Sequence, residues 1–192
     1  MMRLKIGTIL GAIGLAIAAP LSAGTALVEA SVEEHGDGTR SLHHETVIAA
    51  PAARVWDAFS TVDGWKSWGV SFASMDFRAG RTIESGYHQG AVEGDPRNIV
   101  HRILAVVPAR LLVTRLDRVP EGGPVDPAVM QKLWAVYEIE PVDECHTRLR
   151  ISGHGYGEGE DFDRLIAFFE QGNVYSIEMM RAAIEGAAQT TK

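Results

Sequence analysis

Seven histidines are the residues of this sequence best suited to metal or proton chemistry, because imidazole binds metals and exchanges protons near neutral pH. His43 and His44 are adjacent in a segment of strand composition, so their side chains are expected on opposite faces and cannot readily share one ion. Cys145 is the only cysteine, and no His-Glu-x-x-His, Gly-x-Ser-x-Gly or phosphate-loop motif is present. The sequence therefore predicts no metal site, no cofactor and no internal disulfide.

A second group of polar residues is predicted to face one common space. Tyr87, His101 and Tyr137 fall on the inward faces of predicted strands, and Asn173 lies midway along a predicted long helix. Buried polar groups need partners, which in a hollow fold are water or a ligand. The alternative is that Tyr137 and Asn173 bond each other or the backbone. His101 is suited to act as an acid or base, but no inward carboxylate is placed to orient it.

Aromatic residues add an apolar component to the same site. Trp65 and Trp68 are three residues apart on a short predicted helix, where they serve either as core packing or as an aromatic rim for an apolar ligand. The candidate ligand-binding residues are Trp65, Trp68, Tyr87, His101, Tyr137, Phe169, Asn173 and Ile177. No catalytic set is predicted.

These residues are positioned by a simple succession of predicted elements. Residues 43–49 have the composition of a strand, and Pro51 then begins a short helix, followed by one more turn over residues 65–68. Over residues 161–188, apolar residues recur at every third or fourth position, which predicts a long helix. This helix would cover the apolar face of a sheet. Between these helices, alternation with period two predicts strands over 70–77, 81–89, 97–107, 111–118, 132–140 and 147–153.

The N-terminus has the three-part pattern of a secretory signal peptide. Arg3 and Lys5 precede an uncharged stretch, and small residues follow it. We expect a signal peptide over residues 1–30 with cleavage after Ala30, and Ala23 is an earlier alternative site. The other interpretation is an uncleaved anchor, because the uncharged stretch is just long enough to span a bilayer. Cleavage would give a periplasmic or secreted protein without stable membrane insertion.

The rest of the chain has ordinary globular composition, with 46% hydrophobic residues and a formal net charge of -7 over 192 residues. Lys and Arg total 18 and form no run, so nucleic acid is not expected as a partner. Residues 31–42 are polar and contain glycine, which predicts a flexible leader. One domain is then expected over residues 43–188.

The order of the elements and several motifs resemble the SRPBCC, or START-like, superfamily. The similar segments are IAAPAARVWDAF at 48–59, GWKSW at 64–68, VVPARL at 106–111, TRLRISGHG at 147–155 and FFEQGN at 168–173. Their closest likeness is to the branch related to activators of the ninety-kilodalton heat-shock protein ATPase and to polyketide cyclases. The resemblance implies an α+β helix-grip fold: a curved antiparallel sheet wrapped around a long C-terminal helix, with two short helices after the first strand. It also implies a deep cavity but no common reaction.

We therefore expect an exported protein that binds a hydrophobic or amphipathic small molecule, lipid or polyketide-like, between the sheet and the C-terminal helix. Apolar burial would supply most of the affinity, at about 25 cal/mol per Å². Two alternatives remain: an enzyme of cyclase or hydrolase type that uses His101 or His154 in proton transfer, and a protein-interaction domain, which export disfavours. The chain is expected to be a monomer or weak dimer.

Overall fold

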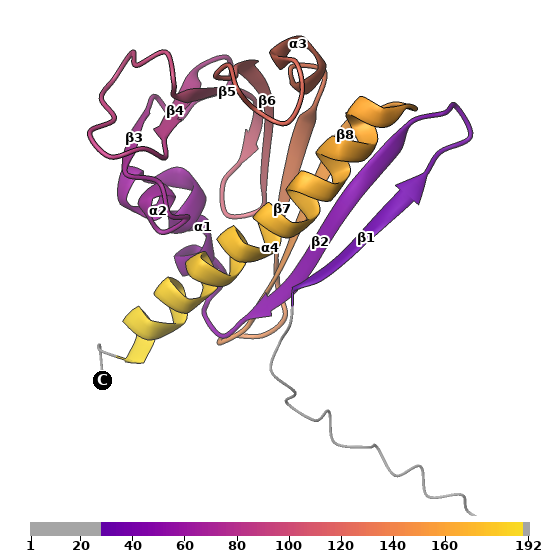
Figure 1. The fold of residues 1–192 in the computed structure, drawn as a ribbon. Helices are drawn as coiled ribbons and strands as arrows, with labels where there is room; N and C mark the ends of the chain where they lie inside the picture. The colour runs from indigo at the N-terminus through magenta and orange to yellow at the C-terminus, as the bar shows by residue number, and fades with distance from the viewer. Residues whose placement is uncertain (1–27, 190–192) are drawn as a thin grey trace, which may run out of the picture.

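The computed structural model describes residues 28–189, which form one eight-stranded antiparallel sheet with a long helix across one face (Figure 1). The strands lie in the order β1-β2-β8-β7-β6-β5-β4-β3. This arrangement confirms the predicted α+β helix-grip architecture. The elements in chain order are β1 (Glu29–Glu34), β2 (Arg40–Ile48), α1 (Ala52–Ser60), α2 (Val62–Lys66), β3 (Phe72–Met75), β4 (Thr82–Gly86), β5 (Ile99–Val107), β6 (Leu111–Arg118), α3 (Pro127–Met130), β7 (Trp134–Pro141), β8 (Thr147–Tyr156) and α4 (Glu160–Gln189).

Helix α4 covers the inner face of the sheet and closes the core (Figure 1). Its side chains Leu165, Ile177 and Met180 are almost fully buried, as expected for an amphipathic helix that packs on a sheet. The first turn carries several acidic residues, which the helix dipole favours at that end. α4 contacts β2, α1 and α3, so its position fixes one wall of any space inside the fold. Within residues 28–189, no helix is both long and apolar enough to cross a membrane.

Helices α1 and α2 form a tight corner that presents the two tryptophans to the core. The hydroxyl of Thr61 accepts a hydrogen bond of 2.9 Å from the backbone N–H of Gly64 and so caps α2. Gly64 is required here because a Cβ at this position would overlap the carbonyl oxygen of Asp57 in α1. The close approach of the two helices places Trp65 in the core, with 4% of its surface exposed.

The expectation of a flexible leader over residues 31–42 is wrong. These residues form most of β1 and the start of β2, which pair in antiparallel register with Ser31 opposite His43. β1 is exposed along its whole length, so it has no apolar alternation by which a sequence pattern would reveal it. Val28, at the start of this hairpin, packs against the main core, and the folded unit therefore begins before residue 43. Most of the predicted signal peptide, residues 1–27, lies outside the described part of the chain.

The strands after α2 follow the predicted segments, but β4 ends at Gly86 rather than at residue 89, and two other differences concern α3 and β8. The long connection after β6 contains the short helix α3, and β8 runs on to Tyr156, beyond the predicted end of the strand at residue 153. Gly155 makes this extension possible because its φ of 88° lies in the left-handed region. A side chain there would also lie 2.6 Å from the carbonyl oxygen of Lys132. The resulting bulge turns Tyr156 into the core.

Candidate ligand-binding site

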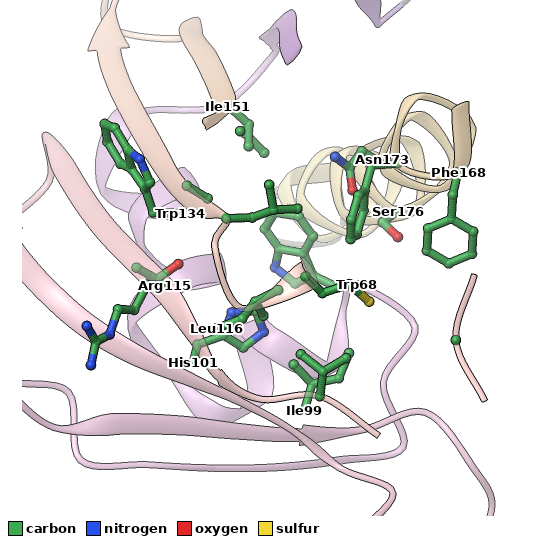
Figure 2. A pocket seen from close by; sticks show the side chains of 18 of the residues that line it. Trp68, Ile99, His101, Arg115, Leu116, Trp134, Ile151, Phe168, Asn173 and Ser176 are labelled. Carbon is green, nitrogen blue, oxygen red and sulfur yellow. The ribbon is translucent and has the colours of Figure 1, made fainter. Parts of the chain in front are cut away.

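A cavity of about 270 Å³ lies between the inner face of the sheet and α4 (Figure 2). Strands β5 to β8 supply one wall, α4 supplies the opposite wall, and the α2 segment closes one end. All eight candidate residues line this cavity: Trp65, Trp68, Tyr87, His101, Tyr137, Phe169, Asn173 and Ile177. The geometry thus brings the candidates together, while their role in ligand binding stays a prediction.

The tryptophans form a fixed aromatic wall. The indole N–H of Trp65 donates to the carbonyl oxygen of Phe59 at 2.8 Å, and that of Trp68 donates to the carbonyl oxygen of Ala58 at 3.0 Å. Both carbonyl groups lie in the last turn of α1, where backbone carbonyls have no N–H partner within the helix. The two indoles stack at 6.0 Å between ring centres, and the Trp68 ring meets that of Tyr137 edge-on at 6.3 Å. Their polar atoms are thereby satisfied, and their carbon faces are left for packing or for a ligand.

His101 is the most unusual polar group in the cavity. It lies on β5, and burial lowers the pKa of its imidazole to about 4, so the ring is neutral at physiological pH. Among residues 28–189, no side chain or backbone group hydrogen-bonds this ring. Its nearest aromatic neighbour is Trp65, with 5.4 Å between ring centres. A neutral imidazole offers one donor and one acceptor, and both atoms are available to a molecule in the cavity.

Tyr137 and Asn173 complete the inward polar set without bonding each other. Burial raises the pKa of Tyr137 to about 12, with Thr114 as its side-chain partner, so the phenol keeps its proton. Within the described residues, no hydrogen bond joins Tyr137 to Asn173. Asn173 and Ser176 project from α4 toward the sheet (Figure 2). These groups can orient a ligand from the side opposite His101.

Tyr87 lies at the mouth of the cavity rather than on a strand. β4 ends at Gly86, one residue earlier, and 55% of the Tyr87 side chain is exposed. Phe168 lies on α4 with 51% of its surface exposed, and it packs edge-on against Phe169 at 5.2 Å between ring centres. Both exposed rings belong to the lining of the cavity, so the opening itself is aromatic.

The interior of the cavity carries no formal charge. Among the described residues, Arg115 is the only charged one in the lining, and its guanidinium points away from the cavity (Figure 2) and pairs with Asp117 at 3.1 Å. No carboxylate between residues 28 and 189 lines the cavity, so none orients His101 as a general base. The setting therefore favours an uncharged ligand, because burying an unpaired charge here would cost several kcal/mol.

Several lining residues were not among the candidates. Thr114 and Leu116 lie on β6, on the same face by alternation, so the pattern over 111–118 contained the signal. By contrast, Val119 directly follows β6 and Met130 is the last residue of α3. These two residues and the loop between them close one end of the cavity. The connection between β6 and β7 has no regular pattern of apolar residues, so the sequence did not predict that it lines the cavity.

The histidines do not assemble a metal centre. His44 lies inward under α4 with 2% of its surface exposed, and His43 lies on the outer face, as strand alternation requires. Burial lowers the pKa of His44, whose Nε2 lies 3.4 Å from the carbonyl oxygen of Glu170. In the described part of the chain, no three His, Cys, Asp or Glu side chains are grouped so as to hold a metal ion.

Comparisons with known structures show the same fold. The solution structure of CalU16 from Micromonospora echinospora superposes with a TM-score of 0.60 at 18% identity, over 85% of this chain and 78% of that one. The Aha1 dimer from Colwellia psychrerythraea gives 0.57 at 18% identity, over 76% and 96%. A protein from Arthrobacter aurescens gives 0.61 at 19% identity, over 81% and 91%. No curated protein matches the sequence significantly.

The sequence itself carries a family match over most of the domain. Residues 49–185 match the family model described as Activator of Hsp90 ATPase homolog 1-like protein. This span runs from the start of the α1–α2 corner almost to the end of α4, and it contains every residue of the aromatic wall. The resemblance to the branch of heat-shock ATPase activator homologues is thereby confirmed, and the chain belongs to the Activator of Hsp90 ATPase homolog 1-like family.

Proposed function

We propose that this protein is an exported carrier or sensor that binds an uncharged, compact hydrophobic or amphipathic molecule between the sheet and α4. The observation that carries the proposal is the neutral aromatic cavity around His101, an imidazole without a partner among the described residues. Such sites take most of their affinity from apolar burial and their orientation from a few polar groups. Here His101, Tyr137 and Asn173 would provide that orientation.

The size of the cavity narrows the ligand class. A volume of about 270 Å³ is near the lower end of the range of small-molecule sites, roughly 300–1,000 Å³. This favours a molecule of a few linked or fused rings, of polyketide-like character, over a lipid with two acyl chains. The aromatic opening at Tyr87 and Phe168 supports the same class, since flat rings pack well against aromatic side chains.

Export remains part of the proposal and rests on the N-terminal pattern of charge and hydropathy. The mature protein would then reside in the periplasm or outside the cell, without stable insertion in a membrane, as a monomer or weak dimer. In that location a role as a partner of a cytosolic chaperone is disfavoured, although family membership is established.

An enzyme of cyclase or hydrolase type is the second candidate. His101 favours it because a neutral imidazole in the cavity has a free nitrogen that can act as a proton acceptor, although its pKa of about 4 makes it a weak base. The lack of an orienting carboxylate in the described lining weighs against it. Turnover separates the two under the substitution His101→Gln: both a carrier and an enzyme keep their affinity within a few-fold, but only an enzyme converts a bound compound in the wild type and loses that conversion in the variant.

The primary test is native mass spectrometry of the mature chain purified from the periplasm, before and after solvent extraction. We expect a stoichiometric uncharged compound, together with 1:1 binding of the neutral probe N-phenyl-1-naphthylamine by the extracted protein. Ser176→Trp fills the cavity and should weaken probe binding at least tenfold. Its matched control is Tyr175→Trp, which alters the preceding residue of α4 at a position 65% exposed. Absence of both the compound and the probe binding would refute the proposal.

A further inference from the structure

A second hollow lies on the outer face of the sheet, away from the cavity. It has a volume of about 680 Å³ and runs over the outward side chains of β1, β2, β8 and β7. Strand alternation distinguishes the two sites, since Val136 of β7 faces outward while Ala135 and Tyr137 face the core. Trp134, the first residue of β7, borders both sites. We call this hollow the outer groove.

An aromatic platform lies at one end of the outer groove. The indole of Trp134 stacks on the imidazole of His154, with 4.2 Å between ring centres and 18° between ring planes. This contact occupies one face of the indole, and 39% of the Trp134 side chain remains exposed. The side chain points away from the inner cavity (Figure 2). A large aromatic ring that is held in place and open to solvent is typical of a recognition surface.

Uncharged hydrogen-bonding groups follow the platform along the groove. The hydroxyl of Ser152 lies 2.8 Å from Nε2 of His154, and Nε2 of His43 lies 2.9 Å from the hydroxyl of Ser41. The same nitrogen of His43 lies 3.4 Å from a carboxylate oxygen of Glu33. Each imidazole therefore uses one nitrogen for a serine and keeps the other. The indole N–H of Trp134 has no partner among the described residues. The middle of the groove thus offers both donors and acceptors, with Ser31 of β1 opposite His43.

The charged residues at the far end are partly paired, and carboxylates outnumber arginines there, since Glu29 also lines the groove and forms no ion pair within residues 28–189. Glu45 pairs with Arg148 at 3.0 Å and with Arg150 at 2.8 Å, and Glu140 pairs with Arg150 at 3.1 Å. Glu138 lies directly across from Arg150 in the sheet register. An anionic ligand would be repelled by these carboxylates, and a wholly apolar one would leave the second nitrogen of each imidazole and the indole N–H of Trp134 without partners.

We propose that the outer groove binds a neutral saccharide of two or more pyranose rings, with one ring stacked on Trp134 and its hydroxyls bonded to the groups around His43 and His154. A pyranose ring has an apolar face of C–H groups and a rim of hydroxyls that both donate and accept. These match an exposed indole followed by uncharged donors and acceptors. A volume of about 680 Å³ leaves room for more than one ring. This inference is independent of the ligand in the inner cavity.

The test is isothermal titration calorimetry of the full chain with maltotetraose, cellotetraose and chitotetraose. Spermidine is titrated separately and represents cationic ligands. We expect at least one tetrasaccharide to bind in 1:1 ratio and spermidine not to bind. Trp134→Ala should weaken that binding at least tenfold. The matched control Tyr175→Ala removes an exposed aromatic ring on α4 and should change it less than twofold.

Urea unfolding serves as the folding control, because Trp134 also borders the inner cavity and probe binding there would not be independent of it. Trp134→Ala should unfold cooperatively, with a midpoint close to that of the wild type. If it fails to fold, Ser31→Arg decides the matter, because it fills the groove from an exposed edge strand without touching the core. Failure of all three tetrasaccharides to bind, unchanged binding by the folded variants, or binding of spermidine alone would each overturn the proposal.

Discussion

The imidazole of His101 and the indole of Trp65 lie 5.4 Å apart between ring centres, inclined by 53°, at the closed end of the inner cavity. Trp65 is anchored by its bond to the carbonyl oxygen of Phe59, whereas His101 has no bond to any described residue. One member of the pair is therefore fixed by the protein, and the other has hydrogen-bonding capacity that the protein leaves unused. This contrast makes His101 the group of the cavity wall most open to a ligand.

The first prediction concerns pH. Burial lowers the pKa of His101 to about 4, against about 6.5 in an unfolded chain. Between these values the unfolded state binds more protons, so the free energy of unfolding falls as pH falls from about 6.5 to about 4. The loss for this residue is at most about 3 kcal/mol, and it is absent above about pH 7. His44 and His154, whose pKa values are also lowered by burial, act in the same direction.

Urea unfolding at about pH 7 and about pH 4.5 measures this effect. His101→Gln cannot titrate in this range, so the variant should lose less stability than the wild type between the two conditions. Equal losses in the two proteins would show that His101 is not held neutral by burial. Binding of N-phenyl-1-naphthylamine by the wild type should not vary between about pH 6 and 8, because the ring stays neutral throughout.

The second prediction concerns the indole bond of Trp65. Trp65→Phe keeps an aromatic ring but leaves the buried carbonyl of Phe59 without its donor, which should cost about 1–3 kcal/mol in the free energy of unfolding. Trp134→Phe is the matched control, since its indole N–H has no partner within residues 28–189 and it should cost less than about 0.5 kcal/mol. Similar costs for the two variants in urea unfolding would mean that the bond contributes nothing.

Alternation and helical periodicity predicted most of the inner site. Both are properties of a buried face, so they located residues such as His101 on β5 and Asn173 on α4 without knowledge of contacts. They also separated His43 from His44. Their success depended on a sheet with one polar and one apolar face, which a single long amphipathic helix covers.

The parts that were missed lack such a face. β1 is exposed on both sides and is held only by pairing with β2, and its glutamates protect a sheet edge from further pairing. The outer groove depends on residues from four strands, and its platform forms only because Trp134 and His154 are paired in register. The glycine-dependent bulge at Gly155 adjoins this pair, and it has no reliable signature in a single sequence.

The third prediction compares two helical glycines. Gly64→Ala would force a Cβ against the carbonyl oxygen of Asp57, so we expect a loss of about 1–3 kcal/mol of stability. Gly172 lies exposed in the middle of α4, and a methyl group there would meet open space, so Gly172→Ala should gain about 0.5–1 kcal/mol. Thermal or urea unfolding of both variants checks the opposite signs. A stabilising Gly64→Ala would show that the α1–α2 corner relaxes.

The last prediction concerns the N-terminus that the mature chain would have under the proposed export. Cleavage after Ala30, as the sequence pattern favours, would remove Val28 from the core and delete two of the six paired positions of β1. Cleavage after Ala23 would keep Val28 in the core and all six paired positions of β1, so we expect the mature chain to begin at Gly24. Intact mass and N-terminal sequencing of the periplasmic protein identify the first residue directly.

A second measurement tests whether the residues kept by cleavage after Ala23 stabilise the fold. Chains that begin at Gly24 and at Ser31 should differ in urea unfolding, because the shorter one loses the burial of Val28, which is worth about 1–2 kcal/mol, and part of a strand pair. A mature protein that begins at Ser31 and is as stable as the longer chain would contradict the role given to β1. A full-length mass in the membrane fraction would instead support the uncleaved anchor.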